Sequence, residues 1–208
     1  MDSELESSPL TGANMLLGVV TWSLVFLAHP IRQAPGNDTT CTVMNATPAQ
    51  LKHRASPLDS LSFTVRRVGV KICYGRPSSR GRLMIGGGHV PYGQLWRTGA
   101  NEPTTIIVSS PLTLAGLPLP AGRYSVYSIP DSVRWTLILN RSTAQWGEES
   151  KYTPEIRALE VGRVQLPVTH LDSVIEQFTI RAVPYDRKTV NLILEWETTR
   201  IVVPVSGE

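Results

Sequence analysis

The sequence predicts an all-β protein, a sandwich or jelly-roll-like domain of eight to ten short strands with one long ordered glycine-rich loop. Three observations lead to this prediction. Apolar and polar residues alternate in several short runs, which is typical of strands with one buried face. Turn residues are frequent, with 16 glycines and 16 prolines among 208 residues. No long helical repeat follows the N-terminal apolar segment, so a layered β architecture is favoured.

The composition limits the class of protein further. Hydrophobic residues make up 41% of the chain and charged residues 18%, which excludes a disordered chain. The net charge of +3 is too small to indicate binding to nucleic acid. Two cysteines exclude a disulfide-dense mini-domain and a four-cysteine zinc site. The length fits one domain with an appendage.

The appendage is the N-terminal segment. Residues 15–28 read MLLGVVTWSLVFLA and would form an apolar helix about 21 Å long, shorter than a hydrocarbon core of about 30 Å. This length favours a signal peptide, although three acidic residues and no basic residue precede the run. We interpret residues 1–34 as a signal peptide or membrane anchor, with a buried helix of the domain as the alternative. Residues 35–58 are a proline-rich linker, and residues 59–205 form the sandwich.

Alternation locates the strands. It is clearest in residues 135–139, 178–182 and 190–196. Residues 124–129 form a strand that we expect to be buried on both faces, and residues 201–205 form a last strand in which Pro204 indicates an edge or a strand end. Residues 155–167 fit a short helix or a strand, and we favour the strand.

Two further segments carry turn signals. In residues 63–74 the apolar positions change from odd to even numbers, which predicts a bulge or tight turn at residues 66–69. Residues 112–119 read LTLAGLPL, which predicts a small hairpin that turns at Ala115 and Gly116.

One long segment does not fit the pattern of strands. Residues 75–103 hold seven glycines and three prolines in 29 positions, and a loop of this length in a compact domain is usually functional. Apolar residues within it predict an ordered, packed loop. Between residues 60 and 101 there are seven basic residues and no acidic one, so the partners of these arginines must come from distant chain or from a ligand.

This loop carries the candidate ligand-binding residues, which are Arg82, Tyr92, Trp96, Arg97 and Asn101. A guanidinium binds carboxylate or phosphate through two hydrogen bonds, and the aromatic rings suit a sugar or another ring. The alternative is structural, with the arginines bound to loop carbonyls and the aromatic rings packed in the core. Glu197 is a candidate partner for Arg97 or Arg82.

Catalytic signals are weak. Glu102 is the only carboxylate within the cluster and His89 the only imidazole, so these two are the candidates for a general acid or base. The chain has no G-x-S-x-G, no H-E-x-x-H and no phosphate-binding loop, and its four histidines are far apart. We therefore predict no metal, no cofactor and no nucleic-acid partner.

Several motifs resemble a known family. These are YGRP at residues 74–77, VPYG at 90–93, WRTGAN at 96–101, LPAGRY at 119–124, QWG at 145–147 and LEWE at 194–197. In this order they resemble a bacterial family catalogued as domain of unknown function 2911, over roughly residues 56–205. The resemblance implies an exported bacterial β-rich domain, and it implies no activity. The acidic N-terminal flank is unlike an ordinary export signal.

Two functions remain open. The first is a module of the periplasm or cell envelope, exported or membrane-anchored through its N-terminal segment, that binds a small polar or anionic ligand or has a structural role. The second is a hydrolase- or lyase-type enzyme that acts on a polar or anionic substrate through Glu102 or His89, with Arg97 and Asn101. The sequence does not indicate the oligomeric state.

Export also bears on the two cysteines. An oxidising compartment favours a disulfide between Cys41 in the linker and Cys73 on a strand. Two independent thiols are the alternative, because pairing cannot be deduced from sequence alone.

Overall fold

The structure is a computed structural model, and it describes residues 39–207. The predicted signal or anchor segment lies outside these residues, as does the start of the predicted linker. Within the described part, no helix is long and apolar enough to cross a membrane.

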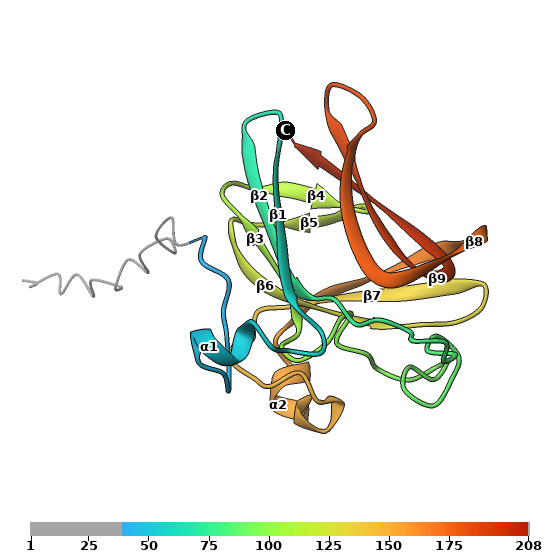
Figure 1. The fold of residues 1–208 in the computed structure, drawn as a ribbon. Coiled ribbons are helices and arrows are strands. Elements are labelled where there is room, and N and C mark those ends of the chain that lie inside the picture. Colours follow the sequence, from blue (N-terminus) through green and yellow to red (C-terminus); the bar gives the residue numbers. More distant parts are fainter. Residues whose placement is uncertain (1–38, 208) are drawn as a thin grey trace, which may run out of the picture. The chain divides into compact units, whose positions relative to one another are not determined.

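Within this range the structure has nine strands and three short helical turns (Figure 1). They are α1 (Pro48–Leu51), β1 (Leu58–Val65), β2 (Val68–Gly75), β3 (Thr104–Val108), β4 (Leu112–Leu114), β5 (Leu117–Leu119), β6 (Gly122–Ile129), β7 (Arg134–Asn140), η1 (Glu149–Lys151), α2 (Pro154–Arg157), β8 (Glu160–Pro184) and β9 (Thr189–Gly207). The all-β prediction and the predicted number of strands are therefore confirmed.

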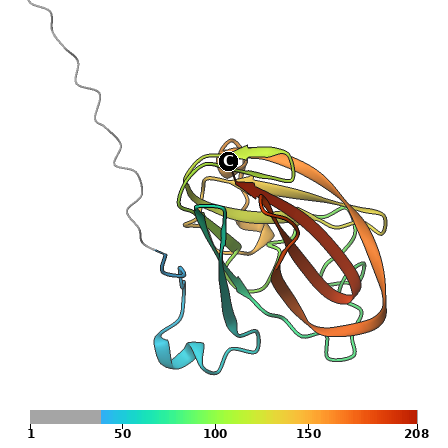
Figure 2. The same cartoon turned by 90° about the horizontal axis from the view of Figure 1, so that it is seen from above.

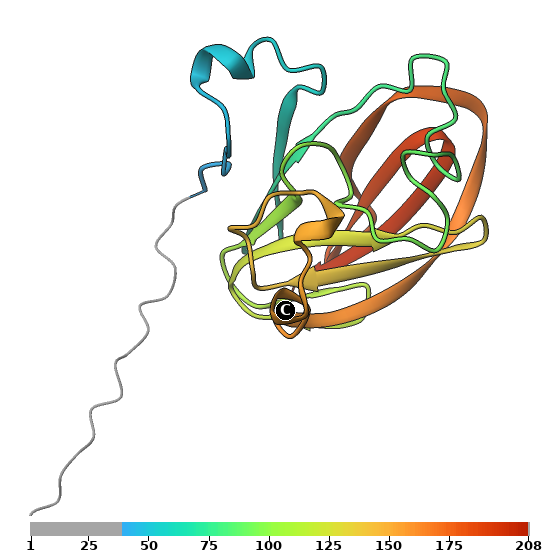
Figure 3. The same ribbon diagram turned by 90° about the horizontal axis from the view of Figure 1, so that it is seen from below.

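The strands form one antiparallel sheet in the order β1-β2-β3-β6-β7-β8-β9-β4-β5. Strand β8 joins two layers, because residues 160–167 pair with β7 and residues 168–184 pair with β9. Its register shifts twice between His170 and Thr179, where the strand bends. Figures 2 and 3 show how β8 and β9 curve around one side of the domain.

One hydrophobic core lies between the two layers. Its largest buried side chains include Trp135 from one layer and Phe178 and Trp196 from the other. Each of the three is at most 2% exposed. Trp96 from the loop between β2 and β3 completes this aromatic group, with its ring stacked on Trp196 at 5.8 Å between centroids. Apolar residues on alternate positions of the strands supply this core, as the sequence pattern predicts.

The predicted turns follow the same logic. Strands β1 and β2 pair up to Val65 and Val68, so Arg66 and Arg67 form a two-residue turn that explains the change of parity. Ala115 and Gly116 have φ of +47° and +86° and form the turn between β4 and β5. Both features agree with the sequence-based predictions.

The C-terminal half differs from the prediction in two places. Residues 154–157 form one helical turn rather than a strand, because Thr153 accepts a hydrogen bond from the Ile156 amide and caps the turn. Residues 160–167 of the first predicted strand and the predicted strand at 178–182 are parts of the single strand β8, and those at 190–196 and 201–205 are parts of β9. Pro204 lies beyond Ile201, the last residue of β9 that pairs with β8.

Candidate functional site

The glycine-rich loop, residues 76–103, is fixed to both layers of the domain. Near its start, the Ser79 amide donates to the Glu176 carbonyl and the Phe178 amide donates to the Pro77 carbonyl, each at 2.9 Å. Near its end, Trp96 exchanges two backbone hydrogen bonds of 2.7 and 2.8 Å with Ser128 of β6. The loop therefore extends one layer at each of its ends, which explains how it keeps its shape without regular strands.

The tip of this loop is held by a carboxylate from β9. Glu197 accepts hydrogen bonds from the amides of Met84 and Ile85, at 2.9 and 2.8 Å. Glu197 has a φ of +52°, which bends β9 at this point. Its carboxylate thus binds backbone amides, and the side chains of Arg82 and Arg97 have other partners.

Arg82 and His89 lie together on the exposed part of the loop. The Arg82 guanidinium donates to the Ser79 carbonyl at 3.0 Å, and its Nη1 lies 3.3 Å from His89 Nε2. Because a guanidinium has no acceptor, this contact requires a His89 nitrogen without a proton. The pair is open to solvent, and no described carboxylate forms a hydrogen bond or ion pair with His89.

The two aromatic candidates differ in what they offer a ligand. Trp96 is 4% exposed and packs in the core, where its Nε1 donates to the Gly99 carbonyl at 3.1 Å. Tyr92 is 46% exposed, and its ring lies over Gly86, where an added Cβ would come within 2.6 Å of it. Only Tyr92 presents part of its surface to solvent, so Trp96 has the structural role that the sequence left open.

Glu102 is buried and paired. Its carboxylate accepts hydrogen bonds of 2.7 and 2.9 Å from Arg54 and one of 2.7 Å from the Met44 amide. Burial raises the pKa of Glu102, but the hydrogen bonds from Arg54 and Met44 outweigh burial, so that its pKa lies below the usual value. The neighbouring Asn101 donates to the Ser56 carbonyl at 3.2 Å. Both residues hold the segment before β1 against the domain.

Arg97 has a different environment from the other loop arginines. Its Nε lies 3.7 Å from Glu149 Oε1, beyond hydrogen-bond distance, and this buried Nε has no hydrogen-bond partner. The side chain is 24% exposed, and its Cδ packs against Gly147, where an added Cβ would approach it within 2.7 Å. The guanidinium is thus positioned by packing, and its pairing with protein acceptors is incomplete.

A buried polar cluster lies beside Arg97, between the sheet and the chain that joins β7 to β8. Gln145 donates to the Tyr127 hydroxyl at 3.1 Å, and Asn140 donates to the Tyr152 hydroxyl at 3.1 Å. Burial raises the pKa of Tyr127, so this phenol stays protonated at neutral pH. The sequence predicts none of Glu149, Tyr127 and Gln145 as neighbours of Arg97, and the QWG string at residues 145–147 is its one signal for this connection.

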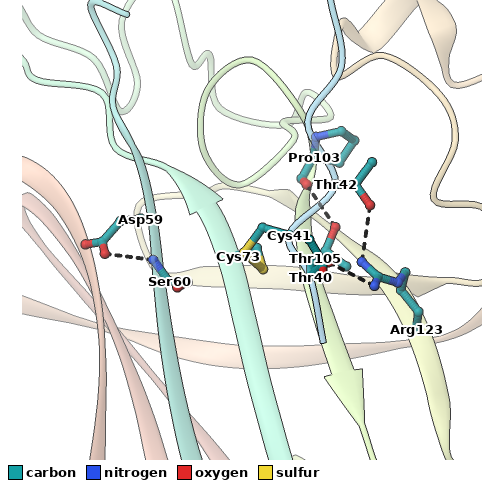
Figure 4. Close-up of a disulfide and its surroundings, with 9 residues drawn as sticks. All are labelled: Thr40, Cys41, Thr42, Asp59, Ser60, Cys73, Pro103, Thr105 and Arg123. Carbon is teal, nitrogen blue, oxygen red and sulfur yellow. Dashed lines mark hydrogen bonds between the residues drawn. A yellow bond between two sulfur atoms is a disulfide. The ribbon is translucent and has the colours of Figure 1, made fainter. Parts of the chain in front are cut away.

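The predicted disulfide is present in the structure. Cys41 and Cys73 are bonded, with their Cα atoms 5.6 Å apart, and no described cysteine is free (Figure 4). Beside it, Arg123 of β6 donates to Thr42 Oγ1 at 3.2 Å and to the Thr40 carbonyl at 3.0 Å. Residues 39–57, most of the predicted linker, are thus attached to β2, to β6 and to the end of the glycine-rich loop.

The predicted ligand-binding residues are spread along the loop. None of them lines the shallow hollow of about 400 Å³ beside the disulfide, which is lined by Thr40, Cys41, Thr42, Arg123, Thr143 and Ala144. Arg97 and Asn101 are near each other through their common neighbour Gly147, while Arg82 and His89 lie elsewhere on the loop. In residues 39–207, no group of three His, Cys, Asp or Glu side chains could hold a metal ion.

Comparison with known proteins decides the family. A family model described as protein of unknown function (DUF2911) matches residues 56–205. The chain belongs to this family. The match spans β1 to β9, so it covers the sandwich and the glycine-rich loop together. No curated protein and no solved structure matches the chain.

Proposed function

We propose that this chain is a non-catalytic binding module of an exported, oxidising compartment such as the bacterial cell envelope. Residues 1–34 carry it across or onto the membrane in this proposal. The Cys41–Cys73 disulfide supports the compartment, because such bonds persist where thiols are not kept reduced. Fractionation of the host tests this part, and recovery of soluble cytoplasmic protein with an intact Met1 contradicts it.

The environments of Glu102 and His89 favour binding over catalysis. Glu102 has a lowered pKa and is already bound by Arg54, so it is a poor proton donor at neutral pH. Its side chain is only 7% exposed, which leaves little room for a substrate to reach it. His89 lies beside a guanidinium rather than a carboxylate that would orient it as a base.

The ligand in this proposal is a small anion that binds Arg97. The observation that carries this proposal is the buried Arg97 Nε, which has no hydrogen-bond partner while the rest of the side chain reaches the surface. A carboxylate or phosphate oxygen would satisfy a guanidinium in this position. Glu149 is the nearest carboxylate at 3.7 Å, and it would have to move aside or share the guanidinium.

Thermal unfolding with added sugars, organic acids and inorganic phosphate tests this ligand. We expect phosphate or an organic acid to raise the Tm of the full chain. In Arg97→Lys the Tm without ligand should stay nearly the same and the rise should disappear, because an ammonium lacks the fork of two parallel donors. Arg187→Lys, in the exposed turn between β8 and β9, is the matched control and should keep the rise.

Two results would contradict the anion site. The first is a panel in which no anion raises the Tm of the natural chain. The second is an Arg97→Lys variant whose free energy of unfolding falls by roughly 1–3 kcal/mol in the absence of any anion, the cost of leaving buried polar groups unsatisfied. That second result would give Arg97 a structural role instead.

A further inference from the structure

Strand β1 ends the sheet on one side and has an open edge. It pairs only with β2, residue for residue from Leu58 with Gly75 to Val65 with Val68, without a bulge. The strand contains no proline and no lysine. At its far end Gly207 approaches the Val65 carbonyl, so the open part comprises residues 58–64.

The register shows which backbone groups of β1 point outward. Gly69 of β2 accepts from the Ser109 amide and donates to the Ser109 hydroxyl, so its backbone faces away from β1. Thr64 is the β1 residue opposite Gly69, and in an antiparallel pair its own N–H and C=O then point away from β2. By the period of two, Ser62 and Ser60 also point outward, and the Ser60 amide is bound by Asp59 at 2.7 Å.

The other end of the sheet is protected, in contrast to β1. Strand β5 has three residues, and Pro118 at its centre lacks an amide hydrogen. Leu117 lies over Gly162 of β8, where an added Cβ would come within 2.6 Å of its side chain. Short length, proline and cover are the usual devices against strand pairing, and β1 has none of them among the described residues.

We propose that β1 pairs antiparallel with β1 of a second copy of this chain, about a two-fold axis at Ser62. The outward backbone groups belong to even-numbered residues, so each must face another even-numbered residue. The register centred at Ser62 brings all three exposed ones, Ser60, Ser62 and Thr64, into pairs. Ser62 then faces Ser62, and Ser60 faces Thr64 of the other copy. The side chains at these positions are small and exposed and stand on one face of the sheet, so they do not hinder the approach of a second strand along the edge.

Charge and apolar surface support a second copy as the occupant. Asp59 lies at one end of β1, and Arg66 and Arg67 follow its other end. In the antiparallel pair, Asp59 of one copy faces Val65 of the other, which directly precedes Arg66. The acidic end of each β1 therefore lies beside the basic end of the other. Leu61 and Phe63 are half-buried and would form apolar pairs across the axis.

Single cysteine variants of the full chain test the register. Ser62→Cys should form a disulfide-linked dimer on a non-reducing gel, because the two Cα atoms would lie about 5.5 Å apart. Ser60→Cys and Thr64→Cys should each remain unlinked alone, since identical positions would be about 14 Å apart, but their mixture should link. Equal linking of all three variants, or none, overturns the proposal.

The mass in solution gives an independent test. The natural chain should change from monomer to dimer over a roughly hundredfold range of concentration, followed by light scattering or sedimentation. Ser62→Pro removes the outward amide and should stay monomeric with a normal Tm, while Ser62→Ala keeps the amide and should still dimerise. A chain that is monomeric throughout, or a Ser62→Pro variant that still dimerises, shows that β1 does not join two copies.

Discussion

Loss of the Cys41–Cys73 disulfide should destabilise the domain mainly through its unfolded state. The bond closes a loop with a sequence separation of 32 residues, which holds α1 and β1. For that separation the chain-entropy relation gives about 3.7 kcal/mol at 25 °C. For a domain of this size, the Tm should fall by about 7–15 °C.

The native contacts of the same segment explain why the loss of stability comes mainly from the unfolded state. Glu102 binds Arg54 and the Met44 amide, so residues 39–57 keep these contacts when the disulfide is reduced. Cys73 is only 4% exposed, so its replacement by a smaller residue would also leave a cavity. Reduction removes no atoms from the core and is therefore the cleaner perturbation. The loss therefore reflects the freedom that the unfolded chain regains.

Urea unfolding measured by tryptophan fluorescence provides the assay, with and without reductant. The buried Trp96, Trp135 and Trp196 report on the core directly. The double variant Cys41→Ala and Cys73→Ala is the control, and reductant should not change its stability. If oxidised and reduced natural protein differ by less than about 1 kcal/mol, the loop-closure reasoning is wrong. Two labelled thiols in the unreduced, unfolded protein would show that the bond does not form.

The remaining predictions concern the buried ion pair and one close backbone contact. Glu102→Gln should cost about 3 kcal/mol or more in urea unfolding at pH 7, because the Arg54 side chain, 11% exposed, loses its counter-charge. Because the pKa of Glu102 is lowered in the folded protein, its contribution is present above the unfolded pKa of about 4.3 and is lost as the pH falls through the folded value. Unfolding at pH 3 should thus show a smaller difference between the two proteins, and an undiminished difference would contradict this. In a thermal scan, Gly75→Ala should lower the free energy of unfolding by about 3 kcal/mol, because the added Cβ would lie 2.0 Å from the Ala100 carbonyl oxygen. The control Gly88→Ala should leave stability unchanged, because its added Cβ would meet nothing within 4 Å.

Local patterns of the sequence were sufficient for the strands and turns. Alternation at residues 135–139 predicts β7, because a strand with one buried face must alternate whatever surrounds it. The turns at Arg66 and Ala115 could be predicted because the two flanking strands pair within a few residues. The disulfide was also within reach, since two cysteines and an export-like segment leave one pairing to test.

The candidate site depended on contacts between distant parts of the chain, which no local pattern encodes. Glu102 looked like the best local acid or base, but Arg54, 48 residues earlier, makes it a buried structural carboxylate. Glu197 looked like a partner for an arginine, but it binds two amides more than 110 residues away. The segment before β1 supplies the partner of Glu102, and the passage of β9 over the loop supplies the partners of Glu197.

The sequence alone therefore determined the all-β class, the order of most strands and the glycine-rich loop. These follow from the period of two and from turn chemistry, which act over a few residues. Only the tertiary structure decided that β8 runs unbroken through both layers, that Trp96 belongs to the core and that Arg97 meets Glu149. The physical reason is that burial and ion pairing depend on which segments pack together. Alternation also looks the same in one long strand as in two short ones, so the pattern cannot show where a strand changes its pairing partner.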